Sequence, residues 1–208
     1  GQEAFGRGDL DNAIAYARQA LEVDPKDEAA LILLARALIY RSYSDYNRAI
    51  DRESALELTT ESLASAPKTP KRLAIQAYTL QANGRGAEAA QTADEALRLD
   101  AGDGLAQVAR ALAYGGVGSF EIALRESRQV AQDATWQMEG QRALAISYSD
   151  LGDYDNAIQA VEQAIALNRH LIPLYFERAL YAMQIGDADA TPTLHKAALE
   201  PSANAPDQ

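Results

Sequence analysis

Apolar and small residues recur along the chain at the spacing expected for amphipathic helices. Residues 138–171 hold two such patterns in succession, separated by Gly152-Asp153. The residues that share one face are Leu144, Ala145 and Tyr148 before the break, and Ala157, Ile158, Val161, Ala164 and Ile165 after it. Because glycine favours the left-handed backbone that ends a helix, this stretch predicts two helices joined by a short turn.

The whole pattern repeats with a fixed period. Glycine stands at Gly84, Gly118, Gly152 and Gly186, which are 34 residues apart. Alanine keeps the same period at Ala77, Ala111, Ala145 and Ala179. A period in this range is typical of solenoid proteins, in which each unit packs on its neighbours and the units together form an extended surface.

The motif L-A-x-x-Y…G-D-Y-x-x-A-I-x-x-x-x-x-A-I in residues 144–165 resembles the tetratricopeptide repeat (TPR). In this family, small residues at the eighth, twentieth and twenty-seventh positions let helices A and B of each repeat pack closely. The matching residues are Ala35, Ala77, Ala111, Ala145 and Ala179; Ala13, Ala55, Ala89, Ala123 and Ala157; and Ala20, Ser62, Ala96, Ala164 and Ala198, with Val130 as the exception. The resemblance implies an all-α fold, a TPR-like α-solenoid of antiparallel helix pairs in a right-handed superhelix.

The resemblance also implies that residues 1–199 form a single array. The expected units are 1–27 (partial), 28–69, 70–103, 104–137, 138–171 and 172–199. Pro192 predicts a short last helix that ends near 199, and residues 200–208 are expected to form a flexible tail. The chain has no initiator methionine and its first unit begins within helix A, so we expect a cytoplasmic or envelope-facing part of a longer chain.

The second unit is the most individual part of the sequence. It has 42 residues, and the surplus lies within 40–53. Tyr40, Tyr43 and Tyr46 follow one another at intervals of three, so a helical segment would place them on one face. Tyr43 and Tyr46 are therefore candidates for a binding site in the insertion. The alternative is that they cover the side of a lengthened hairpin.

Composition argues against several classes of function. The net charge is −11, and no basic stripe of the kind that binds nucleic acid is present. The chain has no cysteine and two histidines in different units, and it lacks the H-E-x-x-H, Walker A and G-x-S-x-G motifs. No apolar run approaches the length of a membrane span. We therefore expect no enzyme activity, metal, cofactor, nucleic-acid partner or direct membrane insertion.

The resemblance implies a concave groove lined by the A helices, and this groove is the candidate site for another protein or peptide. Its predicted residues are Ile32, Arg36, Ile39, Tyr40, Lys71, Ile75, Tyr78, Leu105, Val108, Leu112, Arg142, Ile146, Phe176 and Leu180. Further groove positions hold Gln81, Glu139, Glu177 and Met183. The set is mostly apolar, so it predicts an apolar or amphipathic partner segment. Arg36 and Arg142 are the groove cations suited to one acidic group each.

Two other interpretations account for the same apolar positions. A tightly wound superhelix would bury them within the array, and self-association as a homodimer would cover them with a second copy. The chain would then be an oligomerisation or regulatory module of a larger protein; an accessory domain of an enzyme is a third alternative. The excess of arginine over lysine favours a bacterial genome of high GC content.

Overall fold

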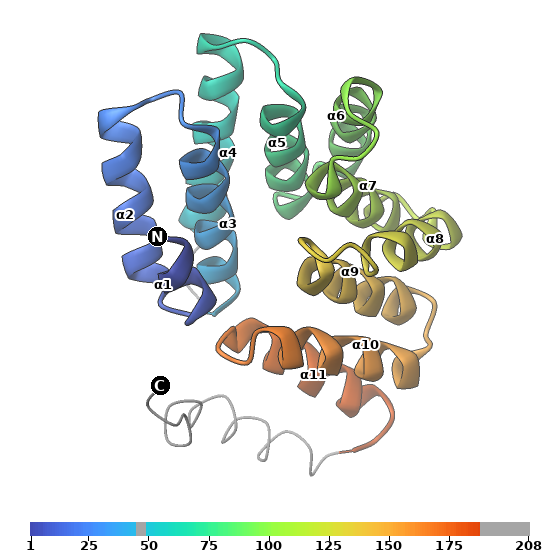
Figure 1. Ribbon diagram of the computed structural model, residues 1–208. Coiled ribbons are helices and arrows are strands. Elements are labelled where there is room, and N and C mark those ends of the chain that lie inside the picture. The colour runs from blue at the N-terminus through green and yellow to red at the C-terminus, as the bar shows by residue number, and fades with distance from the viewer. Residues whose placement is uncertain (45–48, 188–208) are drawn as a thin grey trace.

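The computed structural model describes residues 1–44 and 49–187, and within these ranges the chain forms eleven helices and no strand. The helices are α1 (Gln2–Gly6), α2 (Leu10–Val23), α3 (Glu28–Ser44), α4 (Ala49–Ser65), α5 (Pro70–Ala82), α6 (Gly86–Leu99), α7 (Gly104–Gly116), α8 (Phe120–Val130), α9 (Gln137–Asp150), α10 (Tyr154–Leu167) and α11 (Ile172–Gln184). They stack side by side in a curved array (Figure 1). The predicted last helix and the tail at 200–208 lie outside the described residues.

Recurrent polar and glycine residues set the ends of the helices. The side chains of Asp9, Asp103 and Asp153 each accept a hydrogen bond from the backbone N–H three residues later, at 2.9–3.3 Å. Such caps satisfy a backbone donor that the first helical turn leaves unpaired. The glycines of the 34-residue period, Gly84, Gly118, Gly152 and Gly186, have φ between 75° and 83°. In the hairpins α5–α6, α7–α8 and α9–α10, the period therefore marks the turn between the two helices.

Small buried residues hold neighbouring helices together. Ala77, Ala111 and Ala145 of the A helices and Ala89, Ala123 and Ala157 of the B helices have no exposed surface. Two buried hydroxyl pairs join one B helix to the next A helix, Thr59 with Thr79 at 2.9 Å and Ser127 with Ser147 at 3.0 Å. An alanine side chain allows close approach of two helices, so the packing follows directly from the sequence period.

The surplus residues of the second unit lengthen both of its helices. α3 and α4 have 17 residues each, whereas α5 has 13 and α6 has 14. Arg41 ties the long hairpin together, because its guanidinium donates two hydrogen bonds of 2.8 Å to Asp51 and one of 2.6 Å to Asp11 of α2. Tyr43 is half-buried. Tyr46 lies outside the described residues.

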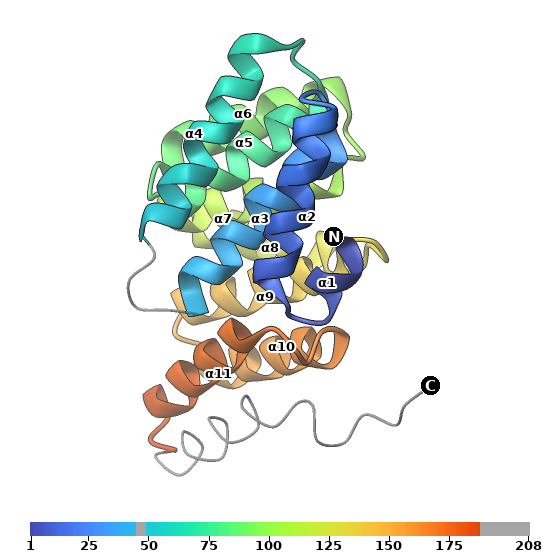
Figure 2. The same cartoon turned by 90° about the vertical axis from the view of Figure 1, so that its left-hand side faces the viewer.

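The array curves until helices distant in sequence meet (Figures 1 and 2). α3 packs on its neighbours α2, α4 and α5, and also on α11. The turn after α1 meets the turn before α11 so closely that a Cβ at Gly8 would lie 2.3 Å from the carbonyl oxygen of His170. Repeats at the two ends of the described array are therefore in contact, in addition to the neighbour contacts expected of a solenoid.

Candidate functional site

The inner side of the curve is formed by the A helices, and most of the predicted groove residues are buried there. Eight are buried: Ile39, Tyr40, Ile75, Tyr78, Leu105, Val108, Leu112 and Arg142. Ile32, Arg36 and Ile146 are half-buried, and Lys71, Phe176 and Leu180 are exposed. These eight side chains pack within the array in this conformation. They therefore have little or no accessible surface for contact with a partner.

One group of contacts across the curve, which we call the first arginine cluster, consists of Phe5, Arg36, Trp136 and Glu139. The Arg36 guanidinium lies between two rings, 4.7 Å from the centre of Phe5 and 4.9 Å from that of Trp136. It also forms an ion pair with Glu139, whose side chain is 4% exposed. A cation over an aromatic face is attracted to it, and the attraction strengthens where water is excluded. The cluster joins α1 and α3 to α9.

A second arginine cluster consists of Tyr40, Tyr43, Arg142 and Glu177. Arg142 Nε donates a hydrogen bond of 2.8 Å to Glu177 Oε1, and the guanidinium lies 5.1 Å from the Tyr43 ring centre and 5.6 Å from that of Tyr40. Burial alone would lower the pKa of Arg142, but Glu177 and the nearby tyrosines hold that pKa well above its usual value. The second cluster joins α3 to α9 and α11, and the Tyr40 hydroxyl donates to Met138 Sδ at 3.6 Å.

The two clusters change the interpretation of the groove cations. Arg36 and Arg142 were predicted to suit an acidic group, and each is paired with a carboxylate of this chain, Glu139 and Glu177. Burial raises the pKa of Tyr40, and it raises that of Tyr78 well above its usual value. Both phenols therefore stay neutral at physiological pH.

Beside the second arginine cluster lies the central pocket, with a volume of about 280 Å³. It is lined by Tyr43, Gln81, Leu112, Arg142, Ile146, Pro173, Phe176, Glu177 and Leu180. It brings together seven residues predicted for the groove, Gln81 and Glu177 among them, and Tyr43 of the insertion. The prediction omitted Pro173, although it is the second residue of its repeat, the position that Lys71 and Leu105 hold in theirs.

One wall of the central pocket continues into an exposed apolar surface, the α11 ridge, formed by Phe176, Leu180 and Met183. These side chains are 49%, 55% and 58% exposed and lie at positions i, i+4 and i+7 of one helix. Residues at this spacing share one helical face. Here the chain combines an accessible pocket with accessible apolar side chains at predicted groove positions.

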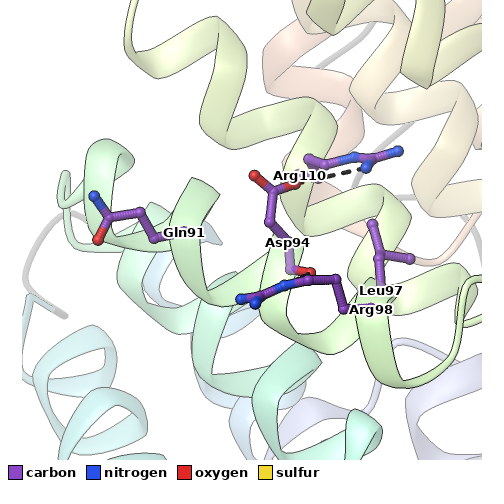
Figure 3. Close-up of a pocket in the computed structure, with 5 residues that line it drawn as sticks. All are labelled: Gln91, Asp94, Leu97, Arg98 and Arg110. Carbon is purple, nitrogen blue, oxygen red and sulfur yellow. Dashed lines mark hydrogen bonds and ion pairs between the residues drawn. The ribbon is translucent and has the colours of Figure 1, made fainter.

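A larger hollow of about 540 Å³ lies elsewhere, between α6 and α7, and is lined by Gln91, Asp94, Leu97, Arg98 and Arg110 (Figure 3). Arg110 is already paired with Asp94 at 3.6 Å and with Glu126. Its charge is therefore satisfied within the chain. In the described ranges, no group of three or more acidic, histidine or cysteine side chains is arranged to hold a metal ion, and no helix is both long and apolar enough to cross a membrane.

Comparison with known families gives two matches, both described as tetratricopeptide repeat, at residues 4–40 and 143–170. The chain contains tetratricopeptide repeats. The second match includes the whole motif at 144–165, and the first covers most of the partial unit and most of α3. No curated protein matches the TPR chain by sequence.

Solved structures show the same solenoid fold. A crystal structure of MamA is 21% identical with a TM-score of 0.53, and the match covers 72% of this chain and 88% of that one. A human IFIT1 dimer with PPP-AAAA is 18% identical with a TM-score of 0.68, covering 93% of this chain and 46% of that one. Cut9 in the APC/C hetero-tetramer Cut9–Hcn1 is 16% identical with a TM-score of 0.62, covering 94% and 37%. At these identities the likeness concerns the fold alone.

Proposed function

We propose that this TPR chain is a protein-interaction scaffold that binds an apolar or amphipathic helical segment of a partner at the central pocket and the α11 ridge. The observation that carries the proposal is the exposure of Phe176, Leu180 and Met183 beside a pocket of about 280 Å³. Contiguous exposed apolar side chains are typical of interaction sites, and this spacing suits helix-in-groove recognition. The Cut9–Hcn1 assembly is an example of a similar solenoid with a protein partner.

The polar residues of the pocket favour a partner with a mainly apolar anchor. Arg142 and Glu177 already neutralise each other, and Gln81 adds an uncharged amide to the lining. Leu112, Ile146 and Pro173 supply apolar walls. A charged anchor would lose its water here without gaining a free counter-charge, which is costly. The same pairing of the inner arginines supports a role without nucleic acid, since phosphates need unpaired cations.

The test uses peptides selected from a displayed library of 20-residue segments on the purified chain. We expect Leu180→Asp to weaken a selected peptide by about tenfold or more, because a Leu side chain buried in an interface contributes about 1.5–3 kcal/mol. Val23→Asp is the matched control, since Val23 is 89% exposed on α2, away from the pocket. Fluorescence anisotropy measures both affinities. Equal binding by the parent chain and Leu180→Asp would refute this site.

Self-association is the second candidate, because the α11 ridge would also suit a second copy of the chain. Light scattering distinguishes self-association from binding of a separate partner. It measures the mass in solution of the parent chain and of a variant with both Leu180→Asp and Met183→Asp. A dimer that becomes a monomer in the variant favours self-association, and a monomer throughout favours a separate partner. Charges at Tyr78 or Leu112 would be poor probes, because these side chains are 2% and 5% exposed and their replacement would disturb the fold.

A further inference from the structure

The two arginine clusters join parts of the array that neighbour packing leaves unconnected. Arg36 of α3 reaches Glu139 and Trp136, about a hundred residues later, and Arg142 of α9 reaches Tyr40 and Tyr43 of α3. In a solenoid the curvature is set by small rotations between successive units, so the two ends are not obliged to meet. These contacts hold the ends together.

We infer that the two arginine clusters act as a gate on the concave groove. With the clusters formed, the array is closed and the central groove residues, such as Ile39, Tyr78 and Val108, are 1–2% exposed. When the clusters separate, small rotations at several repeat interfaces add up, the ends part and these residues face the groove. The role of the gate in regulating a partner rests on the proposed function, but the opening itself does not.

The chemistry of the clusters suits a contact that opens without unfolding the repeats. Neighbouring repeats are joined by fully buried alanines and an apolar core, whose separation would expose much apolar surface. The clusters rest largely on two ion pairs and on rings facing guanidinium groups. Charged groups recover their hydration when exposed, so an ion pair contributes less net stability to closure than apolar packing of the same volume.

The position of the second arginine cluster connects the gate to the proposed site. Arg142 and Glu177 both line the central pocket, and Glu177 follows Phe176 of the α11 ridge. A segment bound on the ridge therefore contacts residues next to the ion pair. Binding that favours the separated cluster would shift the array towards its open form, because a ligand shifts an equilibrium by its difference in affinity for the two states.

The experiment uses the absence of cysteine from the chain. Val108→Cys places a reporter thiol at a groove position, one turn before Leu112 of the central pocket. Val130→Cys is the matched control, since Val130 is equally buried, at 0% against 1%, but lies on a B helix. The rate at which a disulfide reagent modifies each thiol is measured in the parent background and with Arg36→Met and Arg142→Met together.

We expect the double arginine change to raise the modification rate at Val108→Cys by about a hundredfold or more and to leave the rate at Val130→Cys unchanged; a hundredfold rise corresponds to about 2.8 kcal/mol in the opening equilibrium. Equal rates at Val108→Cys in both backgrounds would refute the gate. A parallel rise at both thiols would also refute it, since it would report general unfolding.

A second variant covers the case in which the double change does not fold. Arg36→Lys with Arg142→Lys keeps both positive charges but removes the planar groups that face the aromatic rings. If the modification rate rises at Val108→Cys but not at Val130→Cys in this background, the gate is supported. If the rate at Val108→Cys does not rise, the gate is refuted. The peptide experiment with Leu180→Asp is independent of these rates, so the gate and the proposed binding site can fail separately.

Discussion

Neighbouring repeats and the two ends of the array are joined by different chemistry. Between neighbours, alanines such as Ala111 and Ala123 have no exposed surface and allow close helix contact. Across the curve, Arg36 and Arg142 pair with carboxylates and lie over aromatic rings. The first kind of contact recurs with the 34-residue period, and the second occurs at single positions. Local packing thus builds the repeats, while single side chains make contacts across the curve.

Of the changes that test this difference between the two kinds of contact, breaking the second arginine cluster is expected to lower the free energy of unfolding most. Arg142→Ala leaves Glu177 partly buried without its cation, and removing one partner of a buried ion pair costs about 3–5 kcal/mol. Because Glu177 keeps 19% exposure, we expect a loss near the lower end, about 3 kcal/mol, in the free energy of unfolding. Urea denaturation followed by circular dichroism measures it. Arg142→Met with Glu177→Leu is the control, and it should recover most of the loss because no unpaired charge remains.

A smaller loss is expected from overfilling a contact between neighbours. Ala111 has no exposed surface, so Ala111→Leu must push apart helices that now touch. Added methylene groups in a close-packed core cost about 1–3 kcal/mol. Leucine at the exposed Ala101 is the control and should leave the denaturation midpoint almost unchanged. If both leucine variants are equally stable, the alanine ladder is not what sets the distance between helices.

The smallest effect concerns the turn glycines. Gly152 has φ of 77° and open space where a Cβ would lie, so Gly152→Ala introduces backbone strain without a clash. We expect a loss of about 1 kcal/mol. Gly116 also has open space, but it is the last residue of α7, so Gly116→Ala should instead stabilise slightly, by about 0.5 kcal/mol at most. Thermal unfolding of the two variants should therefore shift in opposite directions, and shifts of the same sign would contradict this assignment of the turns.

The hairpins could be predicted from the sequence because their signals are local. The glycine period places the turns, and the predicted break at Gly152-Asp153 coincides with the turn between α9 and α10. The chemistry of the turns is also local, because Asp9 and Asp153 each stand directly before a helix and cap it. The sequence indicates surplus residues within 40–53, but only the structure shows that α3 and α4 are both long, with 17 residues each.

The accessibility of the groove could not be predicted in the same way. The resemblance assigns Tyr78, Val108 and Phe176 to the concave side, and Val108 and Phe176 hold the same position of their repeats. Tyr78 and Val108 are nevertheless almost fully buried, whereas Phe176 is 49% exposed. The assignment describes the place of a residue within one repeat, whereas burial depends on which other helices pack over that residue, and α7 packs on α5, α6, α8 and α9. One feature of the sequence could have pointed to the arginine clusters. Arginine, glutamate and aromatic residues stand at predicted groove positions of different units, as Arg142, Glu177 and Tyr40 do. Such a pattern does not by itself specify which of them pair.

The sequence by itself determined the all-helical repeat architecture and the glycine turns at Gly84, Gly118 and Gly152. These follow from helical periodicity, from the backbone freedom of glycine and from the small volume of alanine, which act within a few residues or between adjacent helices. Only the tertiary structure decided that Arg36 pairs with Glu139 and Arg142 with Glu177. It also decided that, of the predicted groove, mainly the residues of the central pocket and the α11 ridge are accessible. The physical reason is that small rotations at each repeat interface accumulate along the array, so the meeting of its ends is a property of the whole curve.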